Sequence, residues 1–214
     1  MRIDFISDIN CPWCALGVVS FQKALDLMGG SLNYELHFQP FELNPQLPKE
    51  GKNLFDYLTE KYGLNSERIE GNQQHLRERG DEVGFVFGKR EHIWNSFDAH
   101  RLLYWAETEL GLEAQRKLKL ALLTAYHTDG KNPSDHQVLM NIVEQLGLDK
   151  DRAEFILTGD LFGREVRELE AEWQELGINA VPSIVINREQ LIQGAQPVNI
   201  FVGILMRLKA EQVD

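Results

Sequence analysis

The two cysteines of the chain stand three positions apart, in the stretch SDINCPWCALG. Cys11 and Cys14 are the only cysteines among the 214 residues. A cysteine thiolate attacks a disulfide sulfur, and a second thiol one helical turn away can displace the substrate from the mixed disulfide that forms. The pair is therefore a candidate for thiol–disulfide exchange. It could instead be half of a zinc site or a small structural disulfide.

Neither of these other interpretations has support elsewhere in the sequence. A zinc site takes four ligands, and the six histidines show no H-x₃₋₅-H spacing that would complete one. A disulfide across so short a loop contributes only about 2 kcal/mol on the loop-entropy model. A chain of 214 residues buries enough surface to fold without such a link. Redox chemistry is favoured, and the zinc site and the structural disulfide stay open.

The surrounding residues predict that Cys11 lies where a strand ends and a helix begins. Apolar residues predict a strand at 3–7, and helical spacing predicts a helix that stops at the glycines 29–30. The N-terminus of a helix has unpaired N–H groups and a partial positive charge, which stabilise a thiolate. Pro12, at about the first helical position, has no N–H to leave unpaired. We expect Cys11 to be the exposed nucleophile and Cys14 to be the resolving thiol.

The rest of the chain predicts a helical middle and a strand-containing end. Residues 31–40 alternate apolar and polar side chains, as in a strand with one buried face. Residues 45–159 have helical periodicity almost throughout, and the segment SDHQ predicts a capping box that begins at Ser134. Residues 183–193 predict a β-hairpin with its turn at 187–189, before a final helix.

These elements predict an α/β fold, thioredoxin-like with a large all-helical insertion. Residues 1–44 and 160–214 would form a discontinuous thioredoxin-like domain, and 45–159 the helical insertion domain. The opening β-α-β unit implies parallel strands joined by a right-handed crossover. Both ends of the chain must then meet in one sheet.

Val181 and Pro182 stand at the start of the strand expected beside the first one. Proline is tolerated at the first residue of a strand, which is the simpler interpretation. The functional interpretation is a cis Val181–Pro182 bond opposite the cysteine pair. The N–H and C=O groups of Val181 could then pair with an extended substrate.

The composition and the short motifs of the sequence disfavour several classes of partner and cofactor. With 33 acidic and 22 basic residues the net charge is −11, which disfavours nucleic acids and anionic membranes as partners. The N-terminus lacks the pattern of a secretory signal, so we expect the chain to begin at Met1 and to be cytoplasmic. GFVFGKR does not fit a phosphate-binding loop, because Arg90 stands where serine or threonine is required. We expect no metal, flavin or nicotinamide, and electrons that come from thiols.

CPWC after a short strand, a long helical insertion, and VPSIVIN near the end together resemble the DsbA family. The segments FQPFELNP, NSFDAHRLLYWA and GAQP resemble its FrnE-like cytoplasmic branch, and the resemblance covers essentially the whole chain. It implies a protein disulfide oxidoreductase or isomerase acting on protein or small-molecule thiols and disulfides. Cys11 would be the nucleophile, Cys14 the resolving thiol and Pro182 the cis-proline.

One position departs from the family pattern. Periplasmic DsbA resembles this chain but has a histidine at the position of Trp13, where it helps to stabilise the thiolate. An indole has no positive charge. With Pro12 and Trp13 between its cysteines, the Cys11–Cys14 couple is therefore expected to be less oxidising than that of DsbA.

The same architecture is similar to that of 2-hydroxychromene-2-carboxylate isomerases and kappa-class glutathione transferases. Those enzymes have a serine where Cys11 stands, and Asn95, Ser96 and Arg101 resemble a motif that they share. This implies a second candidate function, a glutathione-linked isomerase or transferase, although Cys11 would form a mixed disulfide with glutathione. Asn95 could reach the site as a substrate-binding group, but a helix cap is the favoured interpretation.

Glutathione is also conceivable as a thiol partner of the oxidoreductase. A third candidate function is a non-catalytic binding or chaperone module that uses the insertion. The sequence does not predict the oligomeric state.

Overall fold

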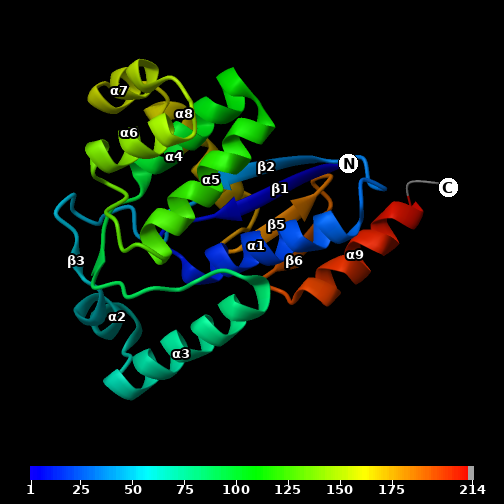
Figure 1. The fold of residues 1–214 in the computed structure, drawn as a ribbon, viewed down its shortest axis with the longest axis horizontal. Coiled ribbons are helices and arrows are strands. Elements are labelled where there is room, and N and C mark those ends of the chain that lie inside the picture. Colours follow the sequence, from blue (N-terminus) through cyan, green and yellow to red (C-terminus); the bar gives the residue numbers. More distant parts are fainter. Residues whose placement is uncertain (212–214) are drawn as a thin grey trace.

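Both ends of the chain contribute to one four-stranded sheet, in the order β2-β1-β5-β6 (Figure 1). The computed structural model describes residues 1–211. Its strands include β1 (Arg2–Ser7), β2 (Glu35–Pro40), β5 (Ser183–Ile186) and β6 (Gln190–Gln193). β1 pairs in parallel with β2 and antiparallel with β5. The first and last segments of the chain thus meet side by side, as the sequence predicts.

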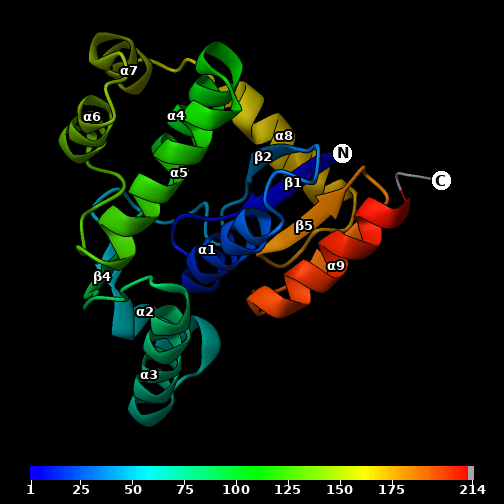
Figure 2. The same cartoon turned by 45° about the vertical axis from the view of Figure 1, so that its right-hand side comes forward.

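Helices cover both faces of this sheet (Figure 2). α1 (Pro12–Leu27) and α9 (Val198–Glu211) pack together on one face, and α8 (Gly163–Glu175) packs on the other through Trp173. The prediction of a single buried face for residues 31–40 was therefore wrong. Strand β2 begins only at Glu35, and after that exposed residue its polar side chains, His37 and Gln39, are buried along with its apolar ones.

The buried polar side chains of β2 all have partners. Gln39 donates to Asp4 at 2.7 Å, and His37 lies 2.6 Å from Glu107. The outer edge of the strand is closed by Gln115, whose amide bonds both the N–H and the C=O of Phe38 at 2.9 Å. Because both buried polar side chains have a hydrogen-bonding partner, the alternating pattern tolerates burial on both sides.

The segment between β2 and α8 is mostly helical. It contains α2 (Leu54–Tyr62), α3 (Ser66–Val83), α4 (Phe97–Trp105), the short π-helix η1 (Ala106–Leu110), α5 (Leu112–His127), α6 (His136–Gln145) and α7 (Lys150–Thr158). A two-residue ladder of β3 (Lys52–Asn53) and β4 (His92–Ile93) interrupts the helices. The largest buried cluster draws on this segment and on both ends of the chain. The domain division at residues 45 and 160 stays a prediction.

Two local predictions can be compared with the structure residue by residue. The hairpin has the predicted strands, and its turn holds Asn187 and Arg188 at φ of 51° and 59°. The predicted capping box was wrong. The cap of α6 is Asp135, which accepts from the Gln137 N–H at 2.8 Å, while Ser134 donates to the Asn95 carbonyl at 2.5 Å. Serine and aspartate cap equally well, and here the tertiary contact takes the serine.

Among residues 1–211 we find no helix with both the length and the hydropathy needed to traverse a bilayer.

Candidate functional site

Cys11 is the N-cap residue of α1, with an extended backbone and Pro12 directly after it in the first turn. Its Sγ accepts a hydrogen bond from the Cys14 N–H at 3.3 Å. The unpaired amides and the dipole of the helix therefore point at this sulfur, which favours a thiolate there. Cys11 is only 4% exposed. The prediction of an exposed nucleophile was wrong, because the sulfur is reached through a cavity.

Cys14 lies one turn further into α1 and is completely buried. Both cysteines are free thiols. Burial, and then contact with Cys11, raises the pKa of the Cys14 thiol well above its usual value, although the Asp8 backbone N–H and the Lys119 charge oppose this. Cys14 is therefore protonated at neutral pH, and it must lose a proton before it can attack a disulfide.

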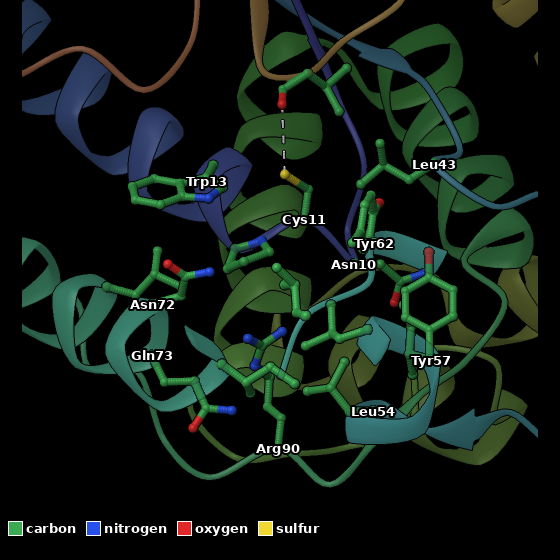
Figure 3. A pocket seen from close by; sticks show the side chains of 17 residues that line it. Asn10, Cys11, Trp13, Leu43, Leu54, Tyr57, Tyr62, Asn72, Gln73 and Arg90 are labelled. Atoms are coloured by element: carbon green, nitrogen blue, oxygen red, sulfur yellow. Dashed lines mark hydrogen bonds between the residues drawn. The ribbon is translucent and has the colours of Figure 1, made fainter. Parts of the chain in front are cut away.

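The Val181–Pro182 peptide bond is cis and faces the cysteine pair. The Cys11 thiol points at the Val181 carbonyl with a sulfur–oxygen distance of 3.8 Å, drawn as the dashed line in Figure 3. A glycine of α1 permits this approach. A Cβ on Gly17 would lie 3.1 Å from Pro182 Cγ, tighter than ordinary van der Waals contact.

A cavity of about 340 Å³ opens beside Cys11 (Figure 3). Its wall is mostly apolar and comes from the start of α1, from α2 and α3, and from the loop before β4. The lining residues are Asn10, Cys11, Pro12, Trp13, Leu43, Leu54, Tyr57, Leu58, Tyr62, Leu64, Ile69, Asn72, Gln73, Leu76, Arg90, Ile93 and Val181. None of these residues is acidic, and Arg90 brings the one permanently positive side chain.

A buried carboxylate organises the loop that precedes Cys11. Asp8 accepts hydrogen bonds from the N–H groups of Asn10 and Leu43 at 3.0 and 2.8 Å and from the Ser96 hydroxyl at 2.7 Å. Burial opposes its ionisation, but the nearby imidazole of His100, 3.7 Å away, and the two N–H groups outweigh it. The pKa of Asp8 is consequently lowered. The loop is therefore held by a charged group that the sequence reading overlooked.

Lys119 brings a second buried charge close to the cysteines. It lies on α5, is fully buried, and its Nζ has no hydrogen-bond partner among residues 1–211. Burial lowers the pKa of Lys119 to about 8, against the attraction of Cys14, Asp8 and Cys11. The sequence reading missed this residue, although it occupies a position of the apolar stripe of α5 between Leu118 and Leu122.

Trp13 borders the cavity, whereas Asn95 does not. The indole of Trp13 packs against the ring of His75 from α3, with ring centres 5.8 Å apart. The Asn95 side chain accepts from the Phe97 N–H at 2.8 Å and donates to Glu42 at 3.2 Å. Asn95 thus holds the start of α4 through the Phe97 N–H, although the N-cap residue of that helix is Ser96.

The other two residues of the supposed isomerase motif are also structural. Ser96 donates to Asp8. Arg101 is buried and donates to Asp98 and to backbone carbonyls that include Leu161 and Gly159. These contacts join α4 to neighbouring segments, and neither side chain lines the cavity beside Cys11.

Comparisons with known proteins agree with this geometry. The family model described as "DSBA-like thioredoxin domain" matches residues 2–205. A probable DsbA oxidoreductase, SCO1869 from Streptomyces coelicolor, is 29% identical over 97% of this chain and 89% of that chain, with a TM-score of 0.87.

Two more distant structures share the fold. A 2-hydroxychromene-2-carboxylate isomerase is 15% identical, covers 100% of this chain and 98% of its own, and has a TM-score of 0.73. The cytosolic disulfide reductase DsbM from Pseudomonas aeruginosa, solved with GSH, is 14% identical over 98% of this chain and 100% of its own, with a TM-score of 0.68. The predicted thioredoxin-like fold class is thereby confirmed.

Proposed function

Because the chain belongs to the DsbA-like thioredoxin family of thiol–disulfide oxidoreductases, we propose that it exchanges disulfides through Cys11 and Cys14. One observation carries the proposal. The Cys11 sulfur sits at the N-cap of α1, where the Cys14 N–H reaches it at 3.3 Å, and it opens onto a cavity with Val181 beside it. A nucleophile, a buried resolving thiol and a free backbone edge are the parts that such exchange needs.

In the oxidised protein, a substrate thiolate attacks Cys11 Sγ. The bond between Cys11 and Cys14 breaks, and Cys14 departs as a thiolate. A second substrate thiolate then attacks the substrate sulfur of the mixed disulfide, which releases oxidised substrate and leaves two protein thiols. The substrate thus loses two electrons and the protein gains them. In the opposite direction, Cys11 attacks a substrate disulfide and Cys14 resolves the mixed disulfide.

The backbone of Val181 supplies the substrate contact in this proposal, together with Pro182. Among residues 1–211, Val181 has no inter-strand partner, and its carbonyl faces Cys11. An extended chain around the substrate sulfur can pair there as an added strand.

We place the proposed reaction in the cytoplasm, where thiols are kept reduced and disulfides are usually transient intermediates of catalysis. DsbM, whose description is that of a cytosolic disulfide reductase, is consistent with this compartment.

A substrate-trapping variant tests the proposal. Cys14→Ala retains the nucleophile but cannot resolve, so it should accumulate Cys11-linked mixed disulfides with disulfide-bearing molecules of a lysate. Cys11→Ser is the matched control and should trap none. Mass spectrometry of the adducts also separates the candidate functions. Protein or small-thiol adducts support exchange, and turnover of a glutathione-dependent isomerisation by Cys11→Ser would support the isomerase instead.

A non-catalytic module would bind its clients equally well in both variants, without any covalent link. That result would contradict the proposed exchange.

A further inference from the structure

The cavity beside Cys11 is unusual in its charge. The chain has a net charge of −11, yet none of the 17 residues that line the cavity is acidic. Arg90 points from the loop before β4 toward the middle of the cavity (Figure 3). Among residues 1–211 no ion pair to Arg90 is found, whereas the adjacent Lys89 pairs with Glu91 at 2.5 Å. A single unpaired cation in an apolar cavity favours an anionic ligand.

The size and wall of the cavity limit what this anion can be. A volume of about 340 Å³ is at the lower end of small-molecule sites. Leu54, Leu76 and Ile93 make the wall apolar, and the guanidinium lies over the ring of Tyr126 at 5.3 Å, which fixes its direction. A planar guanidinium pairs with a carboxylate through two parallel hydrogen bonds.

We propose that this cavity receives a small thiol or disulfide with an apolar or aromatic body and a terminal carboxylate, which Arg90 binds while Cys11 attacks the sulfur. This substrate class deepens the proposed exchange and rests on it. In the step, the Cys11 thiolate forms a bond to one substrate sulfur and the substrate S–S bond breaks. The electron pair leaves with the other half of the substrate as a thiolate.

The test uses two probe disulfides that differ in charge. One is 5,5′-dithiobis(2-nitrobenzoate), an aromatic disulfide with a carboxylate on each half, and the other is uncharged 4,4′-dithiodipyridine. In a Cys14→Ala background the chain has one thiol, so the coloured thiolate or thione released reports the reaction of Cys11 alone. Arg90→Met keeps the apolar stem of the side chain and removes its charge. Lys89→Met is the matched control, because it removes an exposed charge from the adjacent position.

We expect Arg90→Met to lower the rate constant for the nitrobenzoate probe about tenfold or more, as the loss of one charge-assisted contact implies. The rate with dithiodipyridine should change less than about twofold, since that probe presents no carboxylate. Arg90→Lys should recover part of the loss, and Lys89→Met should leave the ratio of the two rates unchanged. If Arg90→Met slows both probes equally, or neither, the cavity does not select carboxylates.

The proposed exchange itself has a separate outcome. A protein whose Cys11 reacts with neither probe contradicts the exchange function, whereas reaction with both and no effect of Arg90 contradicts only the substrate class.

A different observation, the burial of Lys119, carries a second inference. Lys119 is 0% exposed, and no hydrogen bond to its Nζ exists among residues 1–211. An ammonium group in such a position costs free energy unless a negative charge forms nearby. The groups around it are Cys11 and Cys14 from the start of α1, Asp8 from the preceding loop, and His127 on its own helix.

These neighbours differ in whether they can provide a negative charge that pairs with Lys119. Asp8 is already bonded to two N–H groups and a hydroxyl, and His100 of α4 lies 3.7 Å from it. Burial lowers the pKa of His127 well below its usual value, and its ring contacts the Ile9 carbonyl at 2.8 Å. Cys11 accepts from the Cys14 N–H at 3.3 Å and opens onto the cavity, so Cys14 remains as the completely buried group whose charge changes during the reaction.

We infer that the buried ammonium of Lys119 stabilises the thiolate of Cys14, which forms before Cys14 attacks the mixed disulfide and again when Cys14 departs in the opposite direction. In the resolving step the Cys14 thiol releases its proton to water, and its sulfur forms the bond to Cys11. The bond between Cys11 and the substrate breaks, and the substrate leaves as a thiolate. This role of Lys119 rests on the proposed exchange.

Wild-type protein with both thiols should react with the nitrobenzoate probe in two phases, because Cys11 would release the first coloured thiolate and Cys14 the second. In Lys119→Met the rate constant of the first phase should stay within about twofold of the wild-type value. The rate constant of the second phase should fall about tenfold or more, and the pH midpoint of that phase should move to higher pH. Lys117→Met, on the exposed side of the same helix, is the matched control and should leave both phases unchanged.

Circular dichroism and the melting temperature establish that Lys119→Met is folded, and we expect it to melt no lower than wild type. An unchanged second phase with an unchanged pH profile in the folded variant contradicts the role of Lys119. Loss of the first phase in wild type contradicts the exchange function instead.

Discussion

Trp13 places an uncharged ring between the two cysteines of the sequence. The thiolate of Cys11 has the helix N-terminus and the Cys14 N–H to stabilise it. The indole adds no charge, and it packs against His75 of α3, so it also shapes one side of the cavity. The stability of the reduced state, and with it the reduction potential, therefore depends on backbone groups more than on a neighbouring side chain.

Trp13→His should make the Cys11–Cys14 couple more oxidising. A protonated imidazole beside the Cys11 thiolate stabilises the reduced form, and about 30 mV corresponds to ~1.4 kcal/mol for a two-electron couple. We expect a rise of about 20–60 mV in the potential measured against glutathione. Trp13→Phe is the control, because it retains an uncharged ring. A potential that does not rise in Trp13→His contradicts the electrostatic explanation.

At the scale of elements, the site depends on how closely α1 approaches the loop before β5. Gly17 faces Pro182 and Phe5, and a Cβ there would be 3.1 and 3.4 Å from them. The absence of a side chain at this one position lets the helix that holds both cysteines lie directly against the loop that holds Val181. The spacing between Cys11 and Val181 is thus set by packing at Gly17, which has no side chain that could react.

Gly17→Val should push α1 away from the Val181–Pro182 loop. We expect a loss of stability of about 1–3 kcal/mol from overpacking, together with slower reaction of Cys11 with a disulfide probe. Gly203→Ala on α9 is the control, since an added Cβ there meets no atom within 4 Å, and it should gain about 0.5–1 kcal/mol from helix propensity. Denaturant unfolding and probe kinetics measure the two effects. Wild-type stability in Gly17→Val would falsify the close-packing argument.

Local signals predicted the elements that hold the nucleophile, and tertiary contacts decided the rest. CPWC places Cys11 at a strand–helix junction through the preferences of proline and of helix N-termini, which are properties of neighbouring residues. The same reasoning failed at Ser134, because a distant carbonyl of Asn95 competes for its hydroxyl. Arg90 could not be found from sequence periodicity, since it lies in a loop and becomes relevant only when α1, α2 and α3 enclose a cavity.

At the scale of the whole molecule, the buried charges near the site lower stability at neutral pH. Lys119 is fully buried without a hydrogen bond among residues 1–211, and Glu42 and Glu170 also lie in the interior. Burial raises the pKa of both carboxyl groups against the attraction of charged neighbours that include Arg167. The protein retains these charges although apolar residues of similar volume are often more stable in such positions.

Lys119→Met should stabilise the protein near pH 7. Burial lowers the pKa of Lys119 to about 8 in the folded state, against about 10.4 for an unfolded lysine. Between these values the unfolded state binds more protons, so the stability of wild type rises with pH there, and it is lowest below pH 8. We expect the variant to gain on the order of 2–3 kcal/mol at pH 7.

The difference in free energy of unfolding between Lys119→Met and wild type should shrink as the pH approaches 10. Urea unfolding at several pH values would measure it. A gain that is independent of pH from 7 to 10 contradicts the assignment of a buried charge to Lys119.

The order of strands in the sheet also has a consequence for synthesis of the chain. β1 pairs with β5, so Ile3 lies opposite Ile186 and the intervening residues must be accommodated before this ladder closes. Translation proceeds from the N-terminus, and contacts of long sequence separation form late and slowly. The cysteines therefore leave the ribosome long before Val181 can reach them. A nascent chain thus presents both thiols without the Val181 carbonyl opposite them, and the proposed exchange site is complete only when the last strands have been made.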